Sequence, residues 1–454
     1  MKPPPLRYVR PASLEAALEL IDGGSRPLAG GQSLMPLLNL RRRRAGRLVD
    51  LAAIAELHVL ETLADGELSI GAGVTLARLE SEPAVRAHAP LLVDALRLVA
   101  NPQVRARGTV GGNLAHADAV SEVAAALTAL GSTATVRGPD GVRSAPVADL
   151  RLQDDELLVA VRVPAPPAGH GWAIHEVALR YAARALVVAC AVVPEAGAGV
   201  LSGARVAVGG VAGSATALAG FDVLTGVTAD AEPVAAALAE AVAGLVAAPD
   251  PRADEGYRRA VAAELAVRAL RDAARRLPED VDDGDGPPAQ RERPAAPPVR
   301  PPMAERDGPI EIALTVNDRA VRAVAEPRTL LSDLIRSELG LSATHVGCEH
   351  GVCGACNVLL DGVAVRSCLT LAIQADGRAV ETLEGLRDTP EVSELADAFV
   401  QGHALQCGFC TPGFLVTLAE LRRAGIPVTA ERLVGNVCRC TGYAPILRAA
   451  GATR

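Results

Sequence analysis

Eight of the nine cysteines of this 454-residue chain lie between residues 348 and 440, and their spacing restricts the fold of that region more than any other feature. They form two sets of four: Cys348, Cys353, Cys356 and Cys368, then Cys407, Cys410, Cys438 and Cys440. The first ten residues contain neither an apolar segment nor a twin arginine, so we expect a cytoplasmic protein. Cysteines in such a protein are metal ligands or catalytic thiols more often than disulfides. The two sets therefore indicate two metal centres.

The first set has the spacing Cys-x4-Cys-x2-Cys-x11-Cys. This is the plant-type 2Fe-2S spacing, in which each ferric ion takes two soft thiolate ligands and one tight loop supplies three of the four. Glycines in the loop let the backbone curl around a cluster and direct N–H groups at its sulfurs. They are Gly347, Gly351 and Gly354. We therefore expect a plant-type 2Fe-2S cluster in this loop.

The second set consists of two close pairs, Cys-x2-Cys and Cys-x-Cys, separated by 27 residues. Two pairs on separate helical segments also make a four-thiolate site. For both sets the alternatives are a structural zinc site or ordinary buried cysteines, but two complete sets so close together favour clusters. A Rieske centre is excluded, because Cys348-Glu349-His350 is not followed by Cys-x-x-His.

The remaining composition excludes several functions. The chain has 45 basic and 53 acidic residues, a net charge of −8, and only 4 Phe, 4 Tyr and 1 Trp, so nucleic acid is not an expected partner. Lys2 is the only lysine, which excludes a Walker A loop and a pyridoxal Schiff base. No apolar run reaches the roughly 20 residues of a membrane span, so we expect no integral membrane segment. Cys190 lies in an apolar stretch and is expected to be a buried hydrophobic residue.

A segment rich in Pro, Asp and Arg, residues 278–308, is expected to be an extended, semi-rigid linker between domains. Before it, short apolar strands alternate with alanine-rich helices, such as a strand at 26–29 and a helix from Ser33. After it, two alternating runs at 310–316 and 319–324 flank Asn317-Asp318 and predict a hairpin. From Glu381 onward the apolar spacing is helical. This pattern predicts an α+β multidomain fold.

The cysteine motifs carry a resemblance to a known family. CEHGVCGAC, followed by QCGFCTPG and GNVCRCTGYAPI, resembles the iron–sulfur subunit of the molybdenum hydroxylases, which include xanthine dehydrogenase and aerobic carbon monoxide dehydrogenase. The resemblance implies a plant-type cluster in a β-grasp domain and a second 2Fe-2S cluster in an all-helical domain. It also implies that the second cluster lies closest to the molybdopterin, with Gln406 and Cys440 at the pterin interface.

Two loops with paired glycines, residues 28–34 and 109–113, precede the linker. In each loop the backbone could approach a phosphate without side chains in the way. Neither is GxGxxG, so a Rossmann domain is not expected. With LMPLLNLR and AHAD, these loops resemble the FAD-binding subunit of the same family, which implies a vanillyl-alcohol-oxidase-like domain of two subdomains. The implied FAD contacts are Leu28, Ala29, Gly30, Gly31, Gln32, Ser33, Leu34, Thr109, Val110, Gly111, Gly112, Asn113, Asp118 and Leu158.

The sequence departs from the family pattern at three places. Glu122 stands where Asp is usual, and Ala119 where Pro is usual. The third place follows His175-Glu176-Val177, which resembles the HEV motif of a strand in the family. The family often has an acidic and then an aromatic residue after the Arg of this strand, whereas this chain continues from Arg180 into Tyr181-Ala182-Ala183-Arg184. The departure concerns one flavin contact near Arg184.

The expected domains follow from these motifs. They are two FAD-binding subdomains (1–170), the C-terminal domain of the FAD part (171–277), the linker (278–308), a plant-type 2Fe-2S domain (309–380) and a helical 2Fe-2S domain (381–454).

The resemblance implies an electron-transfer chain from the second cluster to the plant-type cluster and then to FAD, which can collect two electrons. It also implies a separate molybdopterin-binding large subunit, a dimer of heterodimers and an external acceptor, which is NAD, quinone or oxygen. No residue of this chain is expected to catalyse the substrate reaction. The alternatives are a stand-alone flavin and iron–sulfur reductase that serves an oxygenase, although no nicotinamide motif is present, and a zinc-stapled scaffold.

Overall fold

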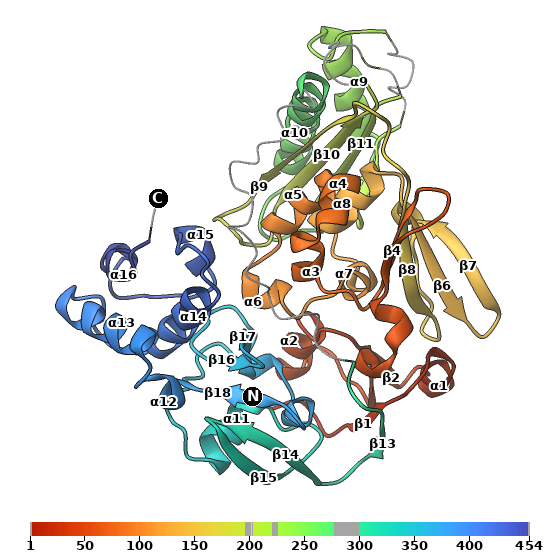
Figure 1. Cartoon of the computed structure of the whole chain (residues 1–454). Coiled ribbons are helices and arrows are strands. Elements are labelled where there is room, and N and C mark those ends of the chain that lie inside the picture. The colour runs from red at the N-terminus through yellow and green to blue at the C-terminus, as the bar shows by residue number, and fades with distance from the viewer. Residues whose placement is uncertain (1, 196–200, 202, 220–225, 277–298, 453–454) are drawn as a thin grey trace. The chain divides into compact units, whose positions relative to one another are not determined.

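The chain folds into two compact units, and each unit contains segments that are separate in the sequence (Figure 1). The computed structural model describes residues 2–195, 201, 203–219, 226–276 and 299–452. The first unit contains residues 1–55, 101–108 and 286–454, and the second contains 56–100 and 109–285. The N-terminal 55 residues therefore belong to the same unit as the cysteine-rich C-terminal part.

A small parallel sheet begins the first unit. Strands β1 (Arg7–Arg10), β3 (Arg47–Asp50) and β2 (Ser25–Leu28) lie in this order, connected by α1 (Leu14–Leu20) and α2 (Leu34–Asn39). The strand expected at 26–29 and the helix expected from Ser33 are confirmed within one residue. The carboxyl ends of the three strands meet at one edge, which is where loops of parallel sheets form sites.

Part of the predicted linker differs from the expected extended tether. Residues 278–298 lie outside the described part, but Met303–Arg306 form strand β13, which pairs antiparallel with β1. The backbone N–H of Arg300 donates to the carbonyl of Ala52. The pairing is possible because β1 is otherwise an edge strand with free backbone groups.

A buried ionic network lies beside this sheet. The Asp50 carboxylate is fully buried and accepts a hydrogen bond from the hydroxyl of Tyr8. Arg10 Nε and Arg300 Nη1 lie 3.7 and 3.6 Å from Asp50 Oδ2, and Gln374 Nε2 donates to it over 3.3 Å. Asp50 thus holds together the N-terminal sheet, the end of the linker and the domain that follows.

A five-stranded sheet in the order β15-β14-β18-β16-β17 forms the next part of the first unit. Its strands are β14 (Ile310–Val316), β15 (Arg319–Ala325), β16 (Asn357–Leu360), β17 (Val363–Arg366) and β18 (Ala379–Glu381). The expected hairpin is confirmed, with φ values of 49° and 61° at Asn317 and Asp318. Helix α11 (Leu331–Asp333) continues into a π-helical turn at Leu334–Glu338. Hydrophobic residues of this sheet and of β1, β2 and α2 share one core.

The C-terminal part of the first unit is helical, as expected (Figure 1). Its helices are α12 (Leu383–Leu386), α13 (Pro390–Gln401), α14 (Thr411–Arg423), α15 (Ala430–Leu433) and α16 (Ala444–Ala449). Phe399 and Phe414 fill its core and are buried. The short helix α6 (Pro102–Arg105) packs on β17.

The second unit contains two sheets. The first, in the order β4-β5-β8-β6-β7, comprises Leu60–Thr62, Leu68–Gly71, Leu157–Val163, Thr133–Gly138 and Gly141–Pro146. Five helices accompany it: α3 (Leu76–Ser81), α4 (Pro83–His88), α5 (Pro90–Leu98), α7 (Val110–His116) and α8 (Glu122–Ala129).

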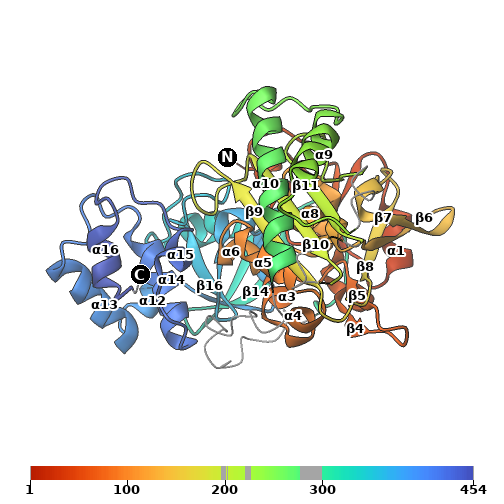
Figure 2. The same ribbon diagram turned by 90° about the horizontal axis from the view of Figure 1, so that it is seen from above.

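The other sheet of this unit has the order β12-β11-β10-β9 and is antiparallel. Its strands are β9 (Gly171–Val177), β10 (Val187–Val193), β11 (Arg205–Gly209) and β12 (Thr216–Ala217). Helix α10 (Glu255–Arg275) packs along β9 and β10, and α9 (Glu232–Ala243) packs on α10 (Figure 2). Cys190 is fully buried in β10, as expected.

The two units together confirm the α+β multidomain fold. Short 3₁₀ turns complete it at Leu51–Ala53, Ala55–His58, Val147–Asp149, Ser367–Leu369 and Ala372–Ala375. No helix among the described residues is long and apolar enough to cross a membrane.

Candidate iron–sulfur and flavin sites

The first cysteine set comes together around a single loop of the first unit. Cys356 and Cys368 are buried, whereas Cys348 and Cys353 are half-buried. The backbone N–H of Cys353 points at Cys348 Sγ, 3.4 Å away. A hydrogen bond from Cys368 outweighs burial and lowers the pKa of Cys356 to about 7. Mutually hydrogen-bonded thiols with converging N–H groups form a suitable donor set for an iron–sulfur cluster.

Two glycines of this loop are required by its geometry. Gly351 and Gly354 have φ values of 85° and 73°, in the left-handed region that favours glycine. A Cβ on Gly354 would lie 2.5 Å from the carbonyl oxygen of Gly435 and 2.9 Å from Arg366 Nη1. A side chain at this position would displace the polypeptide that leads to the second cysteine set.

The second cysteine set is more exposed than the first. Cys407 and Cys440 are exposed, with their sulfurs 3.3 Å apart, whereas Cys438 is buried and Cys410 is half-buried. The N–H groups of Cys440 and Thr441 approach Cys438 Sγ at 3.4 and 3.5 Å. Burial would raise the pKa of Cys438, but the hydrogen bonds from Thr441 and Cys440 outweigh it and lower this pKa. The N–H groups thus favour a thiolate, the form that binds iron.

The cysteines of the second set are grouped in two pairs. Cys407 contacts Cys440, and Cys410 is hydrogen-bonded to Cys438. Among the described residues, no three His, Cys, Asp or Glu side chains converge on a single metal-ion position. Two pairs of thiols match the two iron ions of a 2Fe-2S cluster, each of which takes two ligands.

Direct contacts join the two cysteine sets. The backbone N–H of Val437, which precedes Cys438, donates to the carbonyl of Cys353 over 2.9 Å. Phe409 lies between Cys407 and Cys410 in the sequence, and its ring stacks on His345 with centroids 4.8 Å apart. A Cβ on Gly347 would lie 3.1 Å from this ring and 3.4 Å from Cys353 Sγ. This hydrogen bond and this aromatic ring are among the contacts that connect the two sets.

A contact of the same kind joins the first cysteine set to the N-terminal sheet of its unit. Asn39, the last residue of α2, is fully buried. Its Nδ2 donates to the carbonyls of Glu349 and Cys368 over 2.8 and 3.0 Å. The helix that follows the first glycine loop therefore ends on the cysteine loop.

The first glycine loop connects β2 to α2. Gly31 has a φ of 76°, and its carbonyl accepts from the N–H of Met35. A Cβ on Gly30 would lie 1.9 Å from the carbonyl oxygen of Arg107, so backbone packing alone requires this glycine. Gln32 Nε2 donates to the Gly30 carbonyl, whereas its Oε1 is buried without a hydrogen-bond partner among the described residues. A buried acceptor without a donor suits a polar ligand at this loop.

The second glycine loop lies in the second unit, at the start of α7. Thr109 caps this helix by accepting from the N–H of Gly112 over 3.0 Å. A Cβ on Gly111 would lie 2.7 Å from the carbonyl oxygen of Ala72, so close backbone packing requires this glycine as well. Asn113 Oδ1 accepts from the Ser121 hydroxyl over 2.6 Å. Two further predicted contacts of this unit are Val110, which is buried in the same helix, and Leu158, which is buried in β8. In the first loop, Leu28 is buried, and Ala29, Ser33 and Leu34 are half-buried.

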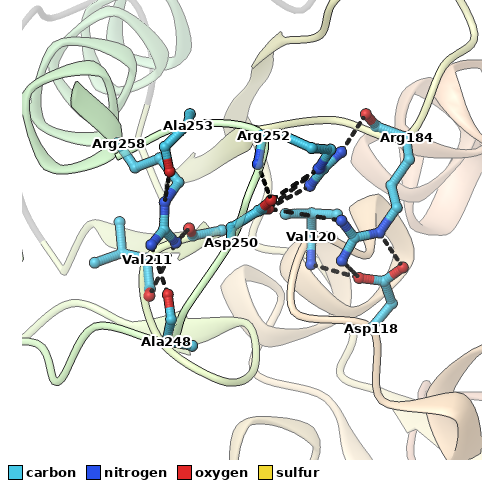
Figure 3. A network of polar contacts seen from close by, with 10 residues as sticks. Asp118, Val120, Arg184, Val211, Ala248, Asp250, Arg252, Ala253 and Arg258 are labelled. Atoms are coloured by element: carbon cyan, nitrogen blue, oxygen red, sulfur yellow. Dashed lines mark hydrogen bonds and ion pairs between the residues drawn. The ribbon is translucent and has the colours of Figure 1, made fainter. Parts of the chain in front are cut away.

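The structure adds a polar network around Asp118 that the sequence does not reveal (Figure 3). Arg184 donates to both oxygens of Asp118, over 2.7 and 2.5 Å, and lies 3.7 Å from Asp250. Asp250 pairs with Arg252, which also donates to the Arg184 carbonyl over 3.0 Å. Burial would raise the pKa of Asp118, but the hydrogen bonds and charge of Arg184 outweigh it and hold this pKa below its ordinary value.

Sequence families match nearly the whole chain. Residues 4–166 match the FAD binding domain in molybdopterin dehydrogenase, and residues 173–273 match the CO dehydrogenase flavoprotein C-terminal domain. Residues 314–382 match the 2Fe-2S iron-sulfur cluster binding domain, and residues 382–451 match a 2Fe-2S binding domain.

Individual proteins show the same likeness. The caffeine dehydrogenase subunit gamma of Pseudomonas sp. (strain CBB1) is 48% identical over 145 residues, which are 30% of this chain and 87% of that protein. The 6-hydroxypseudooxynicotine dehydrogenase complex subunit alpha of Paenarthrobacter nicotinovorans is 36% identical over 289 residues, 61% of this chain and 97% of that protein. This chain belongs to the molybdenum hydroxylase family.

A solved structure agrees with this membership. A chain of carbon monoxide dehydrogenase from Hydrogenophaga pseudoflava, in a form that lacks the Mo-pyranopterin moiety of the molybdenum cofactor, matches with a TM-score of 0.57 and 33% identity. The match covers 60% of this chain and 98% of that one. This molybdenum hydroxylase chain is thus an oxidoreductase with an FAD-binding part and two 2Fe-2S domains in one polypeptide.

Sequence reasoning about this molybdenum hydroxylase chain missed residues that act through long-range contacts. Arg184, Asp250 and Arg252 carry no motif, and only the departure of the segment near Arg184 from the family pattern pointed to that region. Asn39 lies inside the LMPLLNLR motif without a distinguishing signal, and Arg366 stands two residues before Cys368. Proximity to a cysteine motif is the one signal that could have indicated Arg366.

Proposed function

We propose that this chain is the electron-transfer part of a molybdenum hydroxylase complex in the cytoplasm. Electrons enter at the second cysteine set, pass to the first set and then to the flavin-binding part, and leave to an external acceptor, which is NAD, quinone or oxygen. When bound, the clusters supply one-electron transfer and FAD supplies the storage of two electrons.

The order of transfer is supported by a gradient of exposure within the first unit. Cys407 and Cys440 are exposed, as an entry point for electrons from another subunit requires. The first set is more buried, with Cys356 and Cys368 enclosed, and it contacts both the second set through Val437 and the flavin-binding part through Asn39. This single arrangement, in which the first set lies between the other two parts, is the observation that carries the proposal.

The proposed ligands are those of the sequence analysis. Cys348, Cys353, Cys356 and Cys368 would hold the plant-type cluster, and Cys407, Cys410, Cys438 and Cys440 the second one. FAD would contact the two glycine loops, Asp118 and Leu158. Gln32 Oε1 supports a polar ligand at the first loop, because it is a buried acceptor for which the described residues supply no donor.

The proposed partner is a large subunit that binds molybdopterin and carries out the substrate reaction. Gln406 and Cys440 are both exposed and are the proposed contacts with the pterin side. Leu405 and Phe409 are exposed hydrophobic residues on the same segment, which suits burial in a subunit interface. By family analogy the assembly is a dimer of heterodimers.

Spectroscopy of the purified full-length chain tests this proposal. We expect about four irons, one FAD and two distinct 2Fe-2S signals in low-temperature EPR after dithionite reduction. When a tagged chain is isolated from the organism that naturally produces it, a larger polypeptide that contains molybdenum should co-purify with it. A colourless, zinc-loaded protein would contradict the cluster assignment, and isolation without a molybdenum partner would contradict the assignment to a complex.

A further inference from the structure

The guanidinium of Arg366 lies within the proposed plant-type cluster site, and the residue is 1% exposed. It ends β17, two residues before Cys368. Its Nε donates to the carbonyl of Gly351 over 3.0 Å, inside the cysteine loop. Its Nη1 donates to Asn357 Oδ1. The side chain thus lies within the loop that carries three of the four cysteines.

The second terminal nitrogen of Arg366 reaches beyond this loop. Nη2 donates to the carbonyl of Gly435 over 2.5 Å, in the segment that leads to Cys438. It also lies 3.3 Å from Asn101 Oδ1, in the N-cap residue of α6. A Cβ on Gly435 would lie 2.8 Å from Arg366 Nη2 and 2.7 Å from Gln103 Oε1, so a side chain at this position would displace both groups. The polypeptide around the guanidinium is therefore shaped to accommodate it.

None of the partners of Arg366 is negatively charged. Its acceptors are two backbone carbonyls and two asparagine side chains, and no ion pair joins it to an Asp or Glu among the residues described. Two other arginines of the first unit differ in this respect, since the buried Arg10 lies beside Asp50 and the partly buried Arg378 pairs with Asp361. A buried cation without an anion is costly, so a negative charge is expected nearby.

The nearest groups that can carry this charge are the cysteines of the first set. Cys356, Cys368, Cys353 and Cys348 all interact electrostatically with Arg366, in that order of strength. Four thiolates with two ferric ions and two sulfides carry a net double negative charge, which becomes triple when the cluster accepts an electron. A fixed positive charge therefore stabilises the reduced form more than the oxidised form.

We propose that Arg366 is the internal counter-cation of the plant-type cluster and raises its reduction potential above that of the same site without the charge. The proposal rests on the ligand set of the proposed function. Arg366 is a positioning residue in this role, because it acts on the electron equilibrium through the cluster and touches no substrate. Its five fixed N–H donors also join the cysteine loop to Gly435 and Asn101, which a lysine could not do.

The test is a redox titration of the full-length chain, monitored by EPR, in Arg366→Gln and Arg366→Lys. Replacing one cysteine of each set by serine in separate samples assigns the two signals. We expect Arg366→Gln to shift the reduction potential of the plant-type cluster to a more negative value. The shift should be smaller for Arg366→Lys, which keeps a positive charge. The second cluster in the same sample is an internal reference. Arg378→Gln is the matched control, since Arg378 is in the same domain but is paired with Asp361.

Asn357→Asp provides a second route if Arg366→Gln does not assemble its cluster. It places an anion on Arg366 Nη1 and neutralises the charge while the arginine stays in place. The plant-type potential should again become more negative. An unchanged plant-type potential in a variant that retains its iron would overturn the inference, whereas a wild-type chain without two clusters would overturn the proposed function instead.

Discussion

Asn39 donates a hydrogen bond from its side-chain amide to the backbone carbonyl of Cys368, 3.0 Å away, although the two residues are 329 positions apart in the sequence. The same amide donates to Glu349, so that α2 and the first cysteine set are joined at two carbonyls. Both residues lie in the first unit. The flavin-binding part and the cysteine loop are therefore coupled by one fully buried side chain.

Asn39→Ala should lower the free energy of unfolding by about 1–3 kcal/mol, because two buried carbonyls lose their donor. Asn39→Asp should cost more, since it places a carboxylate against the same carbonyls. Thermal unfolding followed by visible absorption measures both effects. An Asn39→Ala variant as stable as the wild type would show that the amide does not hold the loop.

Asp50→Asn should lower the free energy of unfolding by about 3–5 kcal/mol, because it leaves Arg10 and Arg300 buried without their anion. Burial and the Asp50 carboxylate raise the pKa of Tyr8, so its hydroxyl remains a donor and cannot replace this charge. Urea unfolding measures the loss. The control is Glu305→Gln, which removes a partly exposed ion pair with Arg47 and should cost about 1 kcal/mol or less.

The stability of the second unit should fall as pH rises because of Glu122. Burial raises the pKa of this carboxyl to about 8 from an ordinary value of 4.5. Between these values the unfolded chain loses a proton that the folded chain keeps, so the free energy of unfolding decreases with pH and then levels off. Glu122→Gln should flatten this decline in urea titrations at about pH 5 and about pH 8. A slope as steep as in the wild type would show that Glu122 is not the group responsible.

Single cysteine replacements should separate the two proposed clusters. Cys356→Ala should remove the plant-type EPR signal and about two irons, and Cys438→Ala should remove the other signal and a similar amount of iron. Cys190→Ala is the matched control, because Cys190 is buried in β10 of the second unit and should leave both signals intact. Iron analysis and EPR of the three variants decide the assignment, and a loss of signal in Cys190→Ala would contradict it.

The Asp118–Arg184 pair should contribute modestly to stability. Arg184 is about half exposed, with a side-chain exposure of 48%, so we expect a coupling of about 1 kcal/mol or less. A double-mutant cycle with Asp118→Asn and Arg184→Ala measures this coupling. FAD retention in the same variants tests the proposed contact of Asp118, since a structural pair alone would leave flavin content unchanged.

Local patterns made much of this protein predictable from its sequence. The hairpin at Asn317-Asp318 follows from two residues that tolerate positive φ, and the helical C-terminal part follows from apolar spacing. The cysteine sets were recognisable because a cluster loop requires its ligands at short, fixed intervals. Each of these signals extends over a few dozen residues at most.

Other features depend on contacts between residues far apart in the sequence. Strand β13 forms from a proline-rich segment because the edge of β1 offers unpaired backbone groups, which composition does not reveal. Gly30 and Gly111, interpreted as ligand-approach positions, are also required by backbone packing against Arg107 and Ala72.

The sequence by itself determined the family, the cofactor types and the candidate ligands of this protein, because these depend on residue types at short spacing. Only the tertiary structure decided that the first 55 residues share a unit with the cysteine-rich part. It also brought Asn39 to Cys368 and enclosed Arg366 with no carboxylate partner in the described part of the chain. Burial and charge environment arise from packing between distant segments, and no local pattern of residues encodes them.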